Sequence, residues 1–222
     1  MVRLILLSAM AFLATAAPMP SVKYTLPSSS RFLMATFSPD FKLIANGSLD
    51  EKVRIYTVEG GSTANLQYTL DDAMNRVFSL AFSPDSKLLA NGSSDKTLRV
   101  YAMGNGIAPT LKHTLKIPAV TEDVAFSADS ELLDCASLDS KVRVYSLEGQ
   151  VTPMLKYALG DAMDWVFTVA LSPDSKLLAS GSNDEKIRAY GRGDGAAAFA
   201  GDPMLSPFYL KTVADPLVDS RR

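Results

Sequence analysis

The chain has 222 residues and nearly balanced charge, with 22 lysines and arginines against 24 aspartates and glutamates. No cluster of basic residues is dense enough to neutralise a run of phosphates, which argues against a nucleic-acid-binding protein. One cysteine, Cys135, and one histidine, His113, allow neither an internal disulfide nor a Cys/His zinc site. We therefore expect no metal and no cofactor.

The first 17 residues differ from the rest of the chain. A basic start at Arg3 precedes an apolar run from Leu4 to Ala17, which ends in small residues. This pattern is typical of a secretory signal peptide, and the run is too short to span a membrane. The sequence predicts a leader over residues 1–17 and a secreted or secretory-pathway protein without a membrane span in the mature chain. The alternatives are an apolar leader that is never cleaved, or an upstream start that does not belong to the mature protein. The alternative location is the cytoplasm.

Residues 22–190 carry one pattern four times. The motif Phe-Ser-Pro-Asp at 37–40 returns at 82–85, as Phe-Ser-Ala-Asp at 126–129 and as Leu-Ser-Pro-Asp at 171–174, at steps of 45, 44 and 45 residues. A longer block follows each copy, first as LIANGSLDEKVRIY at 43–56. A shorter block precedes each copy, as VKYTL at 22–26, LQYTL at 66–70, LKHTL at 111–115 and LKYAL at 155–159. These blocks define four units at about 22–58, 66–103, 111–147 and 155–190.

Each unit contains four short runs of β-type residues separated by turn residues. The run from Lys52 to Tyr56 alternates apolar and polar side chains, as a strand with one buried face requires. Ser-Pro-Asp and Ser-x-Asp segments separate the runs and favour tight turns. We therefore expect each unit to fold as a four-stranded antiparallel sheet, and stacking of such sheets predicts an all-β propeller.

The units resemble WD repeats, whose usual sequence is close to FSPDGKLLASGSDDKTIRVWD. The resemblance covers residues 22–190 and implies a β-propeller that serves as a docking platform for other proteins. Two features depart from the family. Its terminal Trp is a tyrosine in every unit, and its Gly-His pair is absent, so the family's His-Ser-Trp-Asp hydrogen-bonding chain cannot form in its usual way. The four tyrosines are Tyr56, Tyr101, Tyr145 and Tyr190.

One acidic member of that chain remains in a tight turn of each unit. A carboxylate there can accept backbone N–H groups and stabilise the turn. We therefore assign these residues a structural role and expect neither catalysis nor metal binding from them. They are Asp50, Asp95, Asp139 and Asp184.

The units alternate in type. Units one and three share Ser-Leu-Asp, whereas units two and four share Asp-Ala-Met-x-x-Val-Phe at 72–78 and 161–167. WD-repeat propellers usually close with seven or eight blades, and an open array of four exposes strand edges. Three solutions are open: half of an eight-bladed ring made by a head-to-tail homodimer, a partial propeller from a longer array, or closure with four blades. The first two are favoured.

Residues 191–222 depart from the repeat. Glycines and alanines at the start of this segment predict a linker, Met204–Leu210 is a candidate last outer strand, and the end is a tail. The tripeptide Arg192-Gly193-Asp194 matches an adhesion motif, but three residues are a weak signal and we interpret it as linker.

The residue types favour binding over catalysis. His113 stands where the other units have Tyr24, Tyr68 and Tyr157, and Cys135 stands on a predicted strand, so both are expected to pack inside the sheets. No pair of nucleophile and base recurs in the units. The sequence therefore predicts a non-catalytic protein-interaction scaffold. The alternative is a propeller that binds a small ligand, or acts as an enzyme, at its central channel.

By resemblance, the loops that enter the inner strands form the docking face. These loops are expected at 28–32, 71–76, 116–121 and 160–165. Trp and Arg are frequent hot-spot residues, and Met adapts to varied partners. An apolar and aromatic patch on this face would favour the scaffold, whereas acidic groups or His at the channel would favour the alternative. The candidate contact residues are Arg31, Phe32, Met74, Arg76, Pro118, Met163 and Trp165.

Overall fold

The computed structural model describes residues 22–23, 25–26, 30–58, 64–104, 106–149 and 152–192. The leader predicted at 1–17 and the candidate strand at Met204–Leu210 lie outside these residues. The described chain is all-β, with fifteen strands in four antiparallel sheets. Three sheets have four strands and the last has three.

We call the sheets blades 1 to 4 in chain order, and each begins with its innermost strand. Blade 1 comprises β1 (Phe32–Phe37), β2 (Leu43–Ser48), β3 (Val53–Thr57) and β4 (Asn65–Leu70). Blade 2 comprises β5 (Val77–Phe82), β6 (Leu88–Ser93), β7 (Thr97–Ala102) and β8 (Thr110–Lys116). Blade 3 comprises β9 (Thr121–Phe126), β10 (Leu132–Ser137), β11 (Lys141–Ser146) and β12 (Met154–Leu159). Blade 4 comprises β13 (Val166–Leu171), β14 (Leu177–Ser182) and β15 (Ile187–Gly191).

The blades are offset by one strand from the sequence units. The segment that opens the second unit, LQYTL at 66–70, forms β4 and pairs with β3 of blade 1. The prediction that each unit folds as its own sheet was therefore wrong. The physical reason is that the link from β3 to β4 is a hairpin between antiparallel neighbours, whereas the link from β4 to β5 crosses to the next sheet. Units two, three and four thus each contribute to two blades and tie them together.

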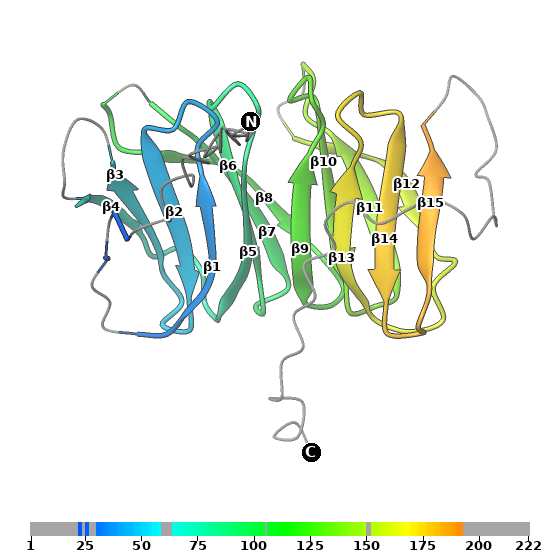
Figure 1. Cartoon of the computed structure of the whole chain (residues 1–222). Coiled ribbons are helices and arrows are strands. Elements are labelled where there is room, and N and C mark those ends of the chain that lie inside the picture. Colours follow the sequence, from blue (N-terminus) through cyan, green and yellow to red (C-terminus); the bar gives the residue numbers. More distant parts are fainter. Residues whose placement is uncertain are drawn as a thin grey trace, which may run out of the picture.

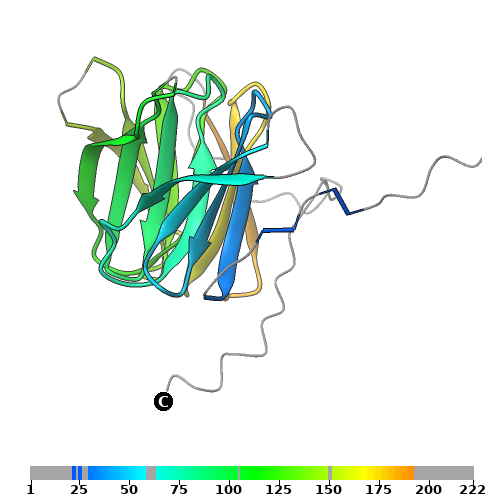
Figure 2. The same cartoon turned by 90° about the vertical axis from the view of Figure 1, so that its left-hand side faces the viewer.

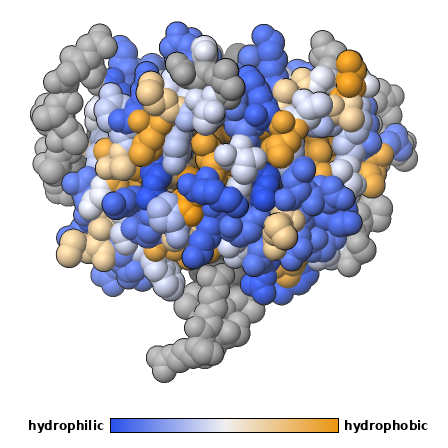
Figure 3. Space-filling view, turned by 180° about the vertical axis from the view of Figure 1, so that it is seen from behind, coloured by the Kyte–Doolittle hydropathy of each residue, from blue (hydrophilic) through white to orange (hydrophobic). Residues whose placement is uncertain are grey.

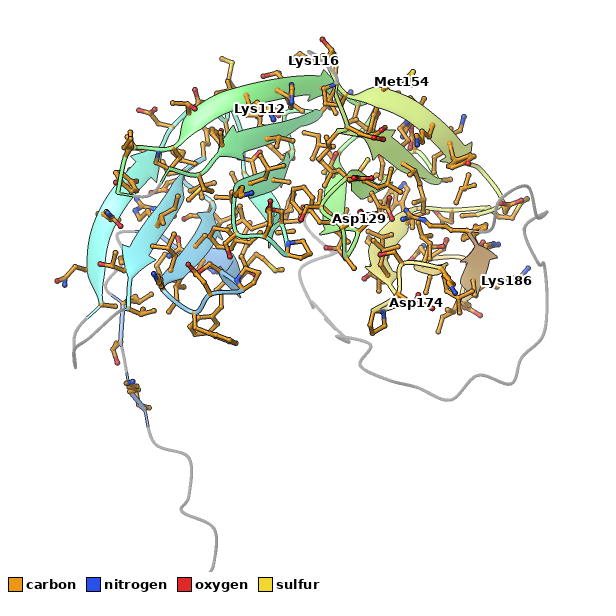
Figure 4. The ribbon with its side chains drawn as sticks, turned by 90° about the horizontal axis from the view of Figure 1, so that it is seen from above. Lys112, Lys116, Asp129, Met154, Asp174 and Lys186 are labelled. Carbon is orange, nitrogen blue, oxygen red and sulfur yellow. The ribbon has the colours of Figure 1, made fainter. Side chains whose placement is uncertain are left out.

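The four blades form an arc with their inner strands side by side (Figures 1 and 2). Strand β5 packs between β1 and β9, and β13 packs against β9. Seen from above, the arc is open on one side (Figure 4). Lys112 and Lys116 of β8 mark its convex side, and Asp129 and Asp174 mark turns nearer the concave side.

Three apolar clusters join the blades, each made by the facing sides of two neighbours. Val53 and Ile55 of blade 1 pack with Val77 and Leu80 of blade 2 in the first cluster. A second cluster joins blades 2 and 3, and a third joins blades 3 and 4. Among the described residues no such cluster joins blade 4 to blade 1. The structure is therefore an open array and does not show closure with four blades.

The turns that end β1, β5, β9 and β13 share one arrangement. Ser38 Oγ donates a hydrogen bond to Asp40 Oδ1 at 2.6 Å, and the same oxygen accepts the Lys42 N–H at 3.2 Å. The residue after the aspartate has a left-handed backbone, with φ of 58° at Phe41 and 60° at Ser86. The carboxylate thus supports a turn that is strained for a residue with a side chain.

The outer surface carries mixed side chains. The convex side is largely hydrophilic, with apolar residues scattered over it (Figure 3). Leu66 on β4, Leu111 on β8 and Leu155 on β12 are among the exposed apolar residues of the outer strands. Within the described residues, no helix is long and apolar enough to cross a membrane.

Candidate protein-docking face

The candidate contact residues lie at one end of the array, where the inner strands begin. We call the connections at 30–32, 71–76, 117–120 and 160–165 the docking rim; it is the lower end in Figure 1. All seven candidates are exposed, and Met74 and Met163 are 79% and 83% exposed. Their contact with a partner stays a prediction.

Two connections of the docking rim are held by the turn aspartates of their own blades. The Met74 N–H donates to Asp95 Oδ2 at 2.9 Å, and the Met163 N–H donates to Asp184 Oδ2 at 2.8 Å. In each case the backbone is bound while the methionine side chain is left in solvent. The arrangement presents a flexible apolar side chain on a fixed backbone.

An arginine four residues later completes each of these anchors. Arg99 Nη2 lies 2.7 Å from Asp95 Oδ2, and Arg188 contacts both oxygens of Asp184, at 3.1 and 2.6 Å. The bonds from Arg188 and the Met163 N–H hold the pKa of Asp184 far below its usual range. Burial opposes the charge on Asp95, but the bonds from Arg99 and Met74 outweigh burial and lower its pKa. Both carboxylates therefore stay ionised at neutral pH.

The other two turn aspartates bind arginine in the same way. Arg54 donates to both oxygens of Asp50, at 3.1 and 2.6 Å. Arg143 does the same with Asp139, at 3.0 and 2.5 Å. The arginine was a partner that the sequence reasoning missed, although it recurs four residues after the aspartate in every unit.

Trp165 forms an aromatic site beside Met163. Its ring meets Phe167 edge to face, with centroids 6.2 Å apart and planes at 82°. Its backbone is fixed on both sides: the N–H donates to Asp164 Oδ1 at 2.7 Å, and the carbonyl accepts the Asn183 N–H at 2.8 Å. The indole remains 39% exposed. An apolar and aromatic patch thus stands on the docking rim.

The residues best suited to catalysis lie inside the sheets. His113 is buried on β8, and Cys135 is fully buried on β10. Burial raises the pKa of the Cys135 thiol to about 12, so the thiolate needed for reaction is scarce at neutral pH. Among the described residues, no group of three or more His, Cys, Asp or Glu side chains could hold a metal ion.

Two aspartates form a polar joint between blades 3 and 4 that the sequence did not predict. Asp123 Oδ2 accepts the Thr168 hydroxyl at 2.9 Å and the Val169 N–H at 3.1 Å. Asp134 is fully buried and forms an ion pair with Arg192. Burial raises the pKa of Asp134 to about 6, against the opposing effect of Arg192. The only sequence signal was that the other units have alanine at the position of Asp134.

Comparisons with known proteins agree with this architecture. The family model for the WD domain, G-beta repeat, matches residues 64–102 and 157–190. A chain in the crystal structure of the mitotic checkpoint complex has a similar fold, with a TM-score of 0.66 and 20% sequence identity. The alignment covers 76% of this chain and 53% of that one, so the present chain spans about half the length of the solved chain. No curated protein matches the sequence.

Proposed function

We propose that this chain, which forms four blades of a β-propeller and matches the WD-repeat family model at 64–102 and 157–190, is a non-catalytic scaffold that binds a protein partner through its docking rim. The observation that carries the proposal is the pair of anchored connections at 71–76 and 160–165. Each has its backbone bound to an ionised aspartate and its methionine side chain in solvent.

These connections have the two properties that a docking site needs. A fixed backbone reduces the conformational entropy lost on binding. Exposed Met and Trp side chains supply apolar area, and methionine adapts to the shape of its partner. Met163 and Trp165, in the connection before blade 4, therefore serve as the centre of the proposed contact. Met74 extends the contact to the connection before blade 2.

The charge of the docking rim indicates what the partner offers. Arg31 and Arg76 are exposed there, in the connections before β1 and β5. An apolar segment flanked by acidic residues would satisfy both the methionines and the arginines. The similar solved chain belongs to a complex, which supports an assembly role for this fold.

Catalysis or small-ligand binding at the central channel has less support. Such chemistry needs a base, nucleophile or metal ligand that a substrate can reach. His113 and Cys135 are buried in the sheets and are unsuited to that role. The scaffold is therefore the function that the geometry favours.

The proposal is tested by capturing partners with the intact protein and three variants. Met163→Glu and Met74→Glu place a charge on the docking rim. Ile107→Glu is the matched control, because Ile107 is 70% exposed in the β7–β8 connection at the opposite end of the strands. Both secreted and cytosolic fractions serve as the source of partners. The predicted leader would bring the protein to secreted partners, and the alternative location would bring it to cytosolic ones.

We expect proteins retained by the wild type to be retained by Ile107→Glu and lost by the two methionine variants. Equal retention by all variants would contradict the proposed site. Loss by Ile107→Glu alone would place the contact on the opposite rim.

A further inference from the structure

The two ends of the array expose positions that the chain buries elsewhere. Ile187, which begins β15, is 62% exposed. Its counterparts in the other blades are Val53, Leu98 and Val142, which are at most 1% exposed. Leu177 and Ala189 of blade 4 are exposed on the same sheet. We call Leu177, Ile187 and Ala189 the tail face, because the next blade would cover them.

The first blade exposes the complementary side, which in blades 2 to 4 packs against the preceding blade. Phe32 and Phe37 of β1 are 38% and 55% exposed, whereas their counterparts Val77 and Phe82 are buried against blade 1. We call Phe32, Phe37 and Phe41 the head face.

Phe41 extends the head face to the upper rim. Its counterpart in blade 2 is Ser86, whose hydroxyl accepts the Asp40 N–H of the preceding blade at 3.3 Å. The position of Phe41 therefore faces toward a preceding blade. With Phe in place of Ser, the hydrogen bond at this joint is replaced by apolar surface, because the phenyl ring is 75% exposed.

Blade 4 also lacks a strand that the chain contains elsewhere. In blades 1 to 3 the outermost strand has the sequence LQYTL, LKHTL or LKYAL, and within the described residues no such strand pairs with β15. The first copy of this pattern, VKYTL at 22–26, has described residues 22–23 and 25–26, which belong to no strand. Val22 is 84% exposed. The segment and β15 lie at opposite ends of the arc (Figure 1).

We propose that two copies of this chain join head to tail into one ring of eight blades. The segment 22–26 of each copy adds to β15 of the other as its fourth strand, and each head face packs on a tail face. The three joints within the chain already show that a tail-type side fits a head-type side. A second copy is the occupant because it offers both the missing strand and the matching face, and two identical joints close the assembly.

The register of the added strand follows from the existing pairs. Ile55 pairs with Tyr68, Val100 with His113, and Val144 with Tyr157. The equivalent pair at the new joint is Ala189 with Tyr24 of the other copy. Thr25 points to the other face of the added strand, because its counterpart Thr69 pairs with Arg54, next to the Ile55–Tyr68 pair, and successive side chains alternate.

The test is a disulfide between two separately marked chains. A tagged full-length chain with Tyr24→Cys is co-expressed with an untagged chain with Ala189→Cys, and the matched control uses Thr25→Cys with Ala189→Cys. After mild oxidation, we expect the first pair to give several-fold more disulfide-linked dimer than the control on a non-reducing gel. Cys135 is fully buried and does not compete.

Two results would overturn the proposal. The first is a Tyr24→Cys pair that cross-links no more than the control. The second is a single chain carrying both cysteines that forms its disulfide internally, at the mass of one chain, because its own segment would then complete blade 4. The head face shares only Phe32 with the docking rim, and the proposed partner contact is centred on Met163 and Trp165, so failure of this inference leaves the proposed scaffold function intact.

Discussion

The joints inside the array and its open end contain the same kind of residue in different surroundings. Leu98 and Ile187 occupy equivalent positions at the start of the third strand of their blades, yet Leu98 is fully buried and Ile187 is 62% exposed. The sheets around them have the same register. The difference comes from the neighbouring blade and the outer strand β8, which flank Leu98, whereas the described residues place neither a next blade nor an outer strand beside Ile187. In this fold a blade supplies half of each core, and the next blade supplies the other half.

The largest effect should come from truncating these two residues. Leu98→Ala is expected to lower the free energy of unfolding by about 2 to 5 kcal/mol, because it empties a packed joint. Ile187→Ala should cost less than about 0.5 kcal/mol in a dilute monomeric sample, where the side chain is in solvent. Urea denaturation at two protein concentrations measures both. Equal losses in the dilute sample would mean that blade 4 is covered within a single chain.

The joint between blades 3 and 4 should differ from the other two in its pH dependence. The pKa of Asp134 is raised from 3.8 to about 6 in the folded chain, so the folded state holds this proton more tightly than the unfolded state. The contribution is fully present below about pH 4 and is lost as the pH rises through about 6, by on the order of 1 to 3 kcal/mol. We expect Asp134→Ala to remove this slope when unfolding is measured from pH 4 to 7. Parallel curves for the two proteins would contradict it.

Glycine substitutions compare a closed joint with the open end. Gly47→Ala should cost about 1 to 3 kcal/mol, because the new methyl group would overlap Val77 of the next blade. Gly181→Ala should cost less, since its described neighbour is the side-chain methyl of Thr168, 2.9 Å from the new Cβ. Thermal melting of both variants checks the order. A larger loss for Gly181→Ala would show that the tail face is packed in the single chain.

The smallest expected effect concerns a connection of the docking rim. Asp184→Ala removes the carboxylate that accepts the Met163 N–H, so exchange of that amide with solvent should become about tenfold faster, as expected for one charge-assisted hydrogen bond. Asp174→Ala, in the turn at the opposite rim, should leave this amide unchanged. Hydrogen exchange resolved at Met163 distinguishes the two. An unchanged exchange rate at Met163 in Asp184→Ala would contradict the role of Asp184 in holding this connection.

Local patterns predicted more of this molecule than distant contacts did. The alternation in 52–56 and the Ser-x-Asp turns predicted strands and hairpins, and the repeat predicted the propeller architecture that the structure and the family model confirm. The offset between units and blades was missed, because VKYTL-type segments look alike whichever sheet they join. The Asp134–Arg192 pair joins residues 58 positions apart and has no local signal. The arginine partner of Asp50 was missed although its spacing of four residues was visible in every unit.

The most direct test of the account is the molar mass of the purified full-length protein, measured by light scattering after size exclusion, for the wild type and for Ile187→Asp. We predict a single species at twice the chain mass for the wild type. We predict a folded species at the mass of one chain for Ile187→Asp, because the new charge lies on the tail face. A wild type that is monodisperse at the mass of one chain would contradict the closed pair of arcs, and so would a broad distribution of larger assemblies.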